Sequence, residues 1–72
     1  MVVTDIYKLV AEIPGQEPEV QPRIFFDIDK AEEKAKAILA TDSAIEEIRI
    51  YREIPDAETG SFTTIGSISV KR

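Results

Sequence analysis

Residues 27–43 read DIDKAEEKAKAILATDS, and this stretch decides the fold. Its apolar residues recur at the three- and four-residue spacing of an amphipathic helix, and they are Ala31, Ala35, Ile38 and Leu39. Asp29 and Glu32 have the spacing of a capping box at a helix start, and Asp27 is the other candidate for the cap. Because the polar run at 41–43 favours a helix end, the sequence predicts one helix of about three turns.

Four strands are predicted on the two sides of this helix, because apolar and polar residues alternate there with the period of half-buried strands. The predicted ranges are 5–13 and about 20–26 before the helix, then about 45–54 and 62 to nearly the end of the chain. Pro22 should place the first half of the second strand at an edge or a bulge, and Pro55 should end the third strand. One helix covers only one face of a sheet. The sequence therefore predicts an α+β fold in the order β-β-α-β-β, with one helix packed on one face of a four-stranded antiparallel sheet.

Length and composition bound the class of protein. A chain of 72 residues can form only one hydrophobic core, so we expect residues 1–72 to be a single small domain. The content of 43% hydrophobic and 32% charged residues is typical of a folded protein rather than a disordered tail. There is no Cys and no His, so no disulfide can form and a zinc site would lack its preferred ligands. With no apolar run long enough to cross a membrane and no secretion signal, we predict a cytoplasmic protein without a cofactor.

Catalytic chemistry has few candidates in this composition. His is missing, and none of the serines, at 43, 61, 67 and 69, stands in a glycine-flanked nucleophile elbow. The carboxylates of Asp27, Asp29 and Glu32 remain, either for acid–base catalysis or for a hard cation. Helix capping explains them, and Lys30 places a positive charge among them. The sequence therefore predicts neither an enzyme nor a metal site.

The face of the sheet turned away from the helix is the candidate binding surface. By alternation, the residues predicted to face the helix are Tyr7, Leu9, Ile24, Phe26, Ile48, Ile50, Phe62 and Ile68. The residues predicted to face away, and so to form a binding surface, are Lys8, Val10, Arg23, Phe25, Arg49, Tyr51 and Ile65, beside Ile6 and Lys71. This second set combines apolar, aromatic and basic side chains.

Three interpretations of this surface stay open. Arg and Lys stems often cover scattered apolar residues on a solvated sheet. Tyr, Phe and Arg are also enriched where proteins bind other proteins or copies of themselves. Finally, Phe25 and Tyr51 could stack on the bases of single-stranded nucleic acid, with Arg23, Arg49 and Lys8 on its phosphates. The formal net charge of −5 and the absence of the motif of sheet-type RNA binders argue against nucleic acid as the partner.

Acidic residues gather at the two predicted hairpin loops. Glu17 and Glu19 flank the first loop, and Asp56 and Glu58 lie in the second. If the two loops were neighbours, they would form an acidic edge able to imitate a nucleic-acid backbone towards a basic protein. Solvated loop charges are the plainer interpretation.

The sequence thus favours a small non-enzymatic module that binds a macromolecule through the outward sheet face, an edge strand, or both. It would act as an adaptor or inhibitor of a protein partner, or bind a second copy of itself, and no membrane is expected as a partner. In size, acidity and lack of catalytic groups the chain is similar in kind to small inhibitors encoded by phages, although no motif ties it to such a family. A single-stranded nucleic-acid binder and an acidic nucleic-acid mimic are the alternatives.

Overall fold

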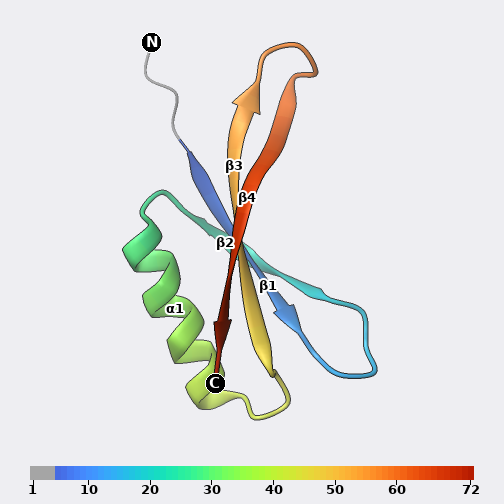
Figure 1. Cartoon of the computed structure of the whole chain (residues 1–72), viewed down its shortest axis with the longest axis vertical. Coiled ribbons are helices and arrows are strands. Elements are labelled where there is room, and N and C mark those ends of the chain that lie inside the picture. The colour runs from blue at the N-terminus through green and yellow to red at the C-terminus, as the bar shows by residue number, and fades with distance from the viewer. Residues whose placement is uncertain (1–4) are drawn as a thin grey trace.

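The structure is a computed structural model that describes residues 5–72. Its elements are β1 (Ile6–Glu12), β2 (Glu19–Phe25), α1 (Ile28–Thr41), β3 (Glu47–Asp56) and β4 (Ser61–Lys71). The strands form a sheet in the order β2-β1-β3-β4, and every neighbouring pair is antiparallel. Figure 1 shows α1 lying along one side of this twisted sheet. The predicted α+β fold, with one helix against four antiparallel strands, is confirmed.

The start of α1 is capped by Asp27, not by Asp29. The backbone of Asp27 is extended, and its Oδ1 accepts a hydrogen bond from the backbone N–H of Asp29 at 2.8 Å. Asp29 already lies in the first turn, where its negative charge suits the helix N-terminus. At the other end, the N–H of Asp42 donates to the carbonyl of Ile38 at 2.9 Å and closes the last turn.

β3 continues through Pro55 to Asp56, although Pro55 was expected to end it. The reason is the local arrangement of the ladder. Pairing between β1 and β3 stops at Glu53, whereas pairing between β3 and β4 continues to Asp56. Within the part of the chain that the structure describes, Pro55 therefore pairs with β4 alone, and proline is tolerated where a strand is paired on one side.

The hydrophobic core lies between α1 and the sheet. Its buried members are Leu9, Ala11, Phe25, Ala31, Ala35, Leu39, Ile45, Ile48 and Ile50. Ala31, Ala35 and Leu39 form the stripe that the helical spacing predicted, and the partly buried Ile38 packs against it. The two alanines keep α1 close to β1 and β3, whose Leu9, Ile48 and Ile50 are almost completely buried.

The face prediction holds for β1 and β3 but is inverted for β2. Phe25 is paired with Tyr7 and belongs to the core, so it lies on the face that packs against α1, the helix face. Ile24 is paired with Lys8 and therefore lies on the opposite face, the open face, where it is 43% exposed. Phe26 lies beyond the end of β2 and is 66% exposed. Both sets of alternate residues in β2 contain apolar side chains, so alternation alone could not decide which set is buried.

β4 changes face partway along because it contains a bulge. Thr64 pairs with Glu53 and Gly66 pairs with Arg52, so Ile65 has no partner in β3. The bulge reverses the alternation before it, so that Phe62 and Thr64 lie on the open face, whereas Gly66, Ile68 and Val70 lie on the helix face. The prediction that Phe62 faces the helix is wrong for this reason.

Candidate functional site

The centre of the open face is occupied by its own ion pairs. The Nζ of Lys8 lies 3.4 Å from the Oε2 of Glu53. The Nε of Arg49 lies 3.7 Å from the Oε1 of Glu12 and 3.5 Å from the Oε2 of Glu47. These cations are already neutralised within the chain, and their stems cover the sheet beneath them. The centre of the open face therefore fits the solvated interpretation better than a phosphate-binding one.

The structure separates the residues that were predicted to form one binding surface. Those on the open face of β1 and β3 are Lys8, Val10, Arg49 and Tyr51, and of these Val10 is only 6% exposed. Arg23 and Phe25 instead lie on the helix face, with the guanidinium carbon of Arg23 5.1 Å from the centroid of the Phe25 ring. Ile65 lies at the bulge of β4 and is 48% exposed. Including Arg23 and Phe25 in the outward surface was wrong, because burying the ring of Phe25 turns this part of β2 towards the core.

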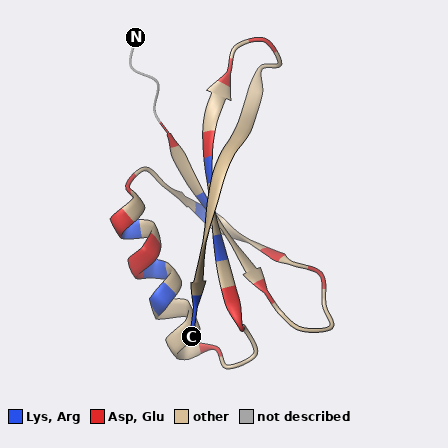
Figure 2. Cartoon of the chain, viewed as in Figure 1, with Lys and Arg blue, Asp and Glu red and all other residues tan. Residues whose placement is uncertain are grey.

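The acidic residues do not form one edge. Glu17 and Glu19 lie at the β1–β2 hairpin, and Asp56 and Glu58 at the β3–β4 hairpin. Because β1 and β3 are antiparallel neighbours, the two hairpin loops leave the sheet at opposite ends, as Figures 1 and 2 show. The prediction of a continuous acidic edge is wrong, and the nucleic-acid mimic loses its geometric basis.

The edge strand β2 carries several features that protect a sheet edge. Pro22 lacks a backbone donor, and the register shifts opposite Lys8–Val10, which marks a bulge or irregularity beside it. Glu19 and Arg23 add charges to a strand of seven residues. Natural sheets use proline, bulges and charges in this way to prevent pairing with another chain.

The other edge strand, β4, carries far less protection. Residues 61–70 read SFTTIGSISV, ten residues without a charge and without a proline. Nine of these ten side chains are exposed, and only Val70 is partly buried. Phe62, Ile65 and Ile68 are 51%, 48% and 43% exposed, respectively. Among residues 5–72, β3 pairs with one side of β4 and no strand lies at its other side, so the outward backbone groups of β4 can pair with an added strand.

A hollow of about 430 Å³ opens beside β4 on the helix face. Ile28 and Glu32 of α1 line it from one side, and Gly66 and Ile68 of β4 line it from the other, together with Ile50 of β3. Gly66 has no side chain to fill this space, and Ile68 remains 43% exposed beside it. A strand added to β4 would place alternate side chains next to this apolar hollow.

Arg52 lines the same hollow and is held in place by Asp5. The Nε of Arg52 donates a hydrogen bond to the Oδ2 of Asp5 at 2.7 Å. This hydrogen bond and the charge of Asp5 raise the pKa of Arg52 above its ordinary value. Arg52 is therefore a fixed, internally paired cation at the hollow.

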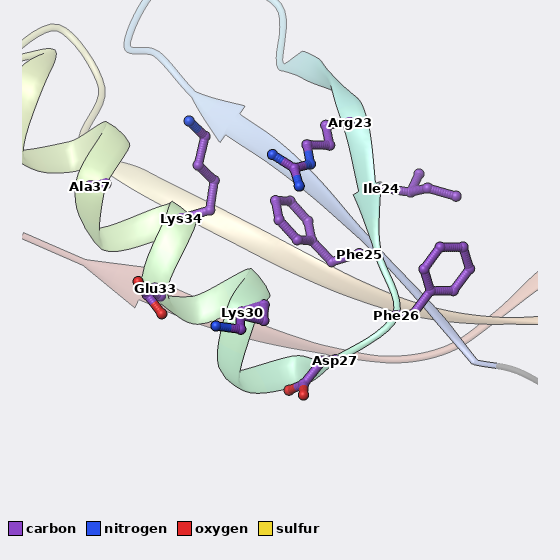
Figure 3. Close-up of a pocket in the computed structure, with 9 residues that line it drawn as sticks. All are labelled: Arg23, Ile24, Phe25, Phe26, Asp27, Lys30, Glu33, Lys34 and Ala37. Atoms are coloured by element: carbon purple, nitrogen blue, oxygen red, sulfur yellow. The ribbon is translucent and has the colours of Figure 1, made fainter.

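A second groove, of about 660 Å³, lies between β2 and α1, at the edge of the sheet opposite to β4. Its lining includes Arg23, Phe25, Lys30 and Lys34, together with Asp27 and Glu33. Figure 3 shows Arg23 and Phe25 pointing from β2 towards α1, while Ile24 points away. Cations and carboxylates are mixed along this groove, so its charge does not select a ligand of either sign.

Other kinds of site find no support in the described part of the chain. Within residues 5–72, no group of three or more His, Cys, Asp or Glu side chains is placed to hold a metal ion. No helix over the same residues is long and apolar enough to cross a membrane. Comparison with protein families, curated proteins and solved structures finds no match for this chain. Its function is therefore inferred from its own residues and geometry.

The bare β4 edge is the feature that the sequence reasoning missed. The exposed Phe62 and Ile68 were assigned to the buried face, and only Ile65 was placed in a binding surface. A signal was present in the ten uncharged residues at 61–70, which have high strand propensity. Without the strand order, that run could equally have belonged to a central strand, where an uncharged sequence is ordinary.

Proposed function

We propose that this chain is a non-enzymatic protein-binding module, an adaptor or an inhibitor, whose partner adds a strand to the free edge of β4. The observation that carries the proposal is the contrast between the two edges of the sheet. β2 has proline, an irregular register and charge, whereas β4 has a run of ten uncharged residues, nine of them exposed, beside a mainly apolar hollow. An edge left without protection is a template for pairing with another chain.

Strand addition explains both parts of this surface. Backbone hydrogen bonds to the added strand supply affinity, and alternate side chains supply specificity. The hollow lined by Ile28 and Ile68 would accept an apolar side chain of the added strand. A partner segment with apolar residues at every second position therefore fits this edge best.

Nucleic acid fits the chain less well than protein. Of the aromatic residues proposed for base stacking, Phe25 is buried, and the cations Lys8 and Arg49 are ion-paired with carboxylates. The net charge of −5 adds long-range repulsion of a phosphate backbone. The cysteine-free composition is compatible with the cytoplasmic location that we propose.

The test replaces one exposed serine of β4 by lysine. Proteins captured from the source cell by the wild-type chain are identified, and each is measured again with Ser67→Lys and with Ser43→Lys. Ser67 lies on β4, whereas Ser43 is an exposed serine in the loop after α1, so the second variant is a matched control. Lysine on an edge strand opposes pairing with another strand. We expect Ser67→Lys to weaken binding by about tenfold or more and Ser43→Lys to leave it unchanged.

The same pair of variants can refute the proposal. Both should keep the wild-type circular dichroism spectrum, because both substituted side chains are exposed. If Ser67→Lys is folded and binds every identified partner as tightly as Ser43→Lys does, β4 is not the contact. Backbone amide shifts that move on β2 and leave β4 unchanged would lead to the same rejection.

A further inference from the structure

Residues 66–70 of β4, which follow the bulge, form a regular and uncharged stretch with a nearly symmetric sequence. Residues 66–70 read GSISV and pair one by one with residues 48–52 of β3. Gly66, Ile68 and Val70 lie on the helix face, and the two serines, Ser67 and Ser69, lie on the open face. Ile68 is the midpoint of this stretch.

We infer that the strand added to β4 is the β4 strand of a second copy, antiparallel to the first and related to it by a two-fold axis through Ile68. The inference rests on the proposed function, since it keeps the β4 edge as the contact and names its partner. Two such copies would form a continuous eight-stranded sheet with both helices on the same side. A two-fold interface is self-complementary, so the test of the idea is whether β4 fits itself.

With the two-fold axis at Ile68, every residue of 66–70 is paired with a residue of the second copy that lies on the same face of the sheet. Residues directly opposite in an antiparallel pair share a face. With Ile68 opposite itself, Ser67 lies opposite Ser69 on the open face, and Gly66 lies opposite Val70 on the helix face. Moving the axis to Ser67 would bring the bulge at Ile65 into the ladder, and moving it to Ser69 would bring in Lys71. The axis at Ile68 is the one that pairs all of residues 66–70 with themselves.

Burial favours the same arrangement. Ile68 is 43% exposed and lines the hollow. In the dimer, the Ile68 of the second copy would cover this side chain from beyond the edge of β4. β4 contributes little buried surface to its own chain, because all but one of the side chains at 61–71 are exposed. Chains of about this size bury only about 60% of their unfolded surface and gain stability from association.

Charge does not oppose the contact, even though each copy carries −5. The paired stretch has no charged residue, so no like charges lie opposite each other in the ladder. The neighbouring carboxylates of β3 are turned to hydroxyl groups of their own chain: Thr64 donates to Glu53 at 2.8 Å, and Ser69 donates to Glu47. The more distant charges are screened beyond about 8 Å at physiological salt.

A single cysteine tests the register directly, because the chain has none of its own. In Ile68→Cys the two thiols of a dimer would face each other across the axis. Opposite residues of an antiparallel pair have Cα atoms about 4.5–5.5 Å apart, within the range of a disulfide. Ile24→Cys is the matched control, since Ile24 is also an isoleucine of an edge strand and is also 43% exposed. In oxidised glutathione, we expect Ile68→Cys to form a covalent dimer, at twice the chain mass of 8.1 kDa, about tenfold faster than Ile24→Cys.

Light scattering of the wild-type chain over a range of concentration and salt gives the second readout. We expect a dimer that the double substitution Ser67→Lys, Ser69→Lys converts to a monomer, because it places lysines opposite each other twice, while Ser43→Lys remains dimeric. A wild-type chain that is monomeric throughout, or equal rates of disulfide formation at 24 and 68, overturns the inference. If that monomer still loses a captured partner protein through Ser67→Lys, the proposed function stands without the dimer. If it loses none, both are rejected.

Discussion

Replacing Phe25 by alanine tests the packing of β2 against α1. Phe25 is 9% exposed and lies in the core, and Arg23 packs over its ring at 5.1 Å. Truncation of a buried phenylalanine to alanine costs about 3–5 kcal/mol. Since Phe25 lies on an edge strand, where its surroundings can relax, we expect the lower value, about 3 kcal/mol.

This loss is a large part of the stability of so short a chain. At about 0.05–0.15 kcal/mol per residue, 72 residues give a free energy of unfolding of about 4–11 kcal/mol. For a domain of this size each kcal/mol lowers Tm by about 4–8 °C, so Phe25→Ala should lower Tm by about 12–24 °C. Far-UV circular dichroism during heating and in urea measures both quantities.

The neighbouring Phe26 supplies the control. It is 66% exposed, so Phe26→Ala should change the free energy of unfolding by about 0.5 kcal/mol or less. Arg23→Ala removes the contact with the ring and should cost about 0.5–1 kcal/mol. Equal losses for Phe25→Ala and Phe26→Ala, or a larger loss for Phe26→Ala, would refute the assignment of faces in β2.

Three further predictions concern the helix cap, the β3–β4 loop and nucleic acid. Asp27→Ala removes the N-cap and should lower the free energy of unfolding by about 1 kcal/mol in thermal melts. Asp29→Ala should lower it by less than half of that. A larger loss for Asp29→Ala than for Asp27→Ala would make Asp29 the cap. Hydrogen bonds from the backbone N–H of Glu58 and from the hydroxyl of Thr63 lower the pKa of Asp56 below its usual 3.8. The ionised side chain therefore stabilises the folded chain above about pH 4, and this stabilisation is lost as the pH falls through the folded-state pKa. Wild type should therefore be more stable than Asp56→Asn at neutral pH, with melting curves that converge in acid, and a constant difference would contradict this. A fluorescent single-stranded oligonucleotide should show no change in anisotropy at low salt, because Lys8 is ion-paired; binding that weakens as salt is added would reinstate nucleic acid as a partner.

The local elements of this fold could be predicted from the sequence because each has a strong periodic signal. Ala31, Ala35 and Leu39 form the helical stripe, and the alternation around Leu9 and Ile48 correctly assigned the faces of β1 and β3. In β3 the other set of alternate residues is mostly charged, so only one set can be buried, and in β1 the other set carries Lys8 and Glu12 between the buried Ile6 and Val10. These assignments needed no knowledge of which strands are neighbours.

The sites depended on information that is not local. In β2, Ile24 and Phe25 are consecutive apolar residues on opposite faces, and contact with α1 decides which one is buried. In β4, the bulge at Ile65 moves Phe62 to the other face, and its one local signal is the adjacent Gly66, which strict alternation does not take into account. The strand order, which separates the acidic loops and makes β4 an edge, is a property of the whole chain. A prediction of surfaces from alternation fails wherever such long-range contacts decide the outcome.

The strand order also determines how the chain can fold. β1 and β2 are joined by a short loop, as are β3 and β4, so each hairpin can form from residues close together in sequence. The central ladder joins residues 35 to 47 positions apart, from Glu12 with Glu47 to Ile6 with Glu53. An isolated two-stranded hairpin is marginally stable at best in water, so the β3–β4 hairpin, which has no helix of its own, gains a core only when this ladder closes. Because this closing joins residues far apart in sequence, we expect it to be slower than hairpin formation, and we expect a fragment of residues 47–72 not to fold alone.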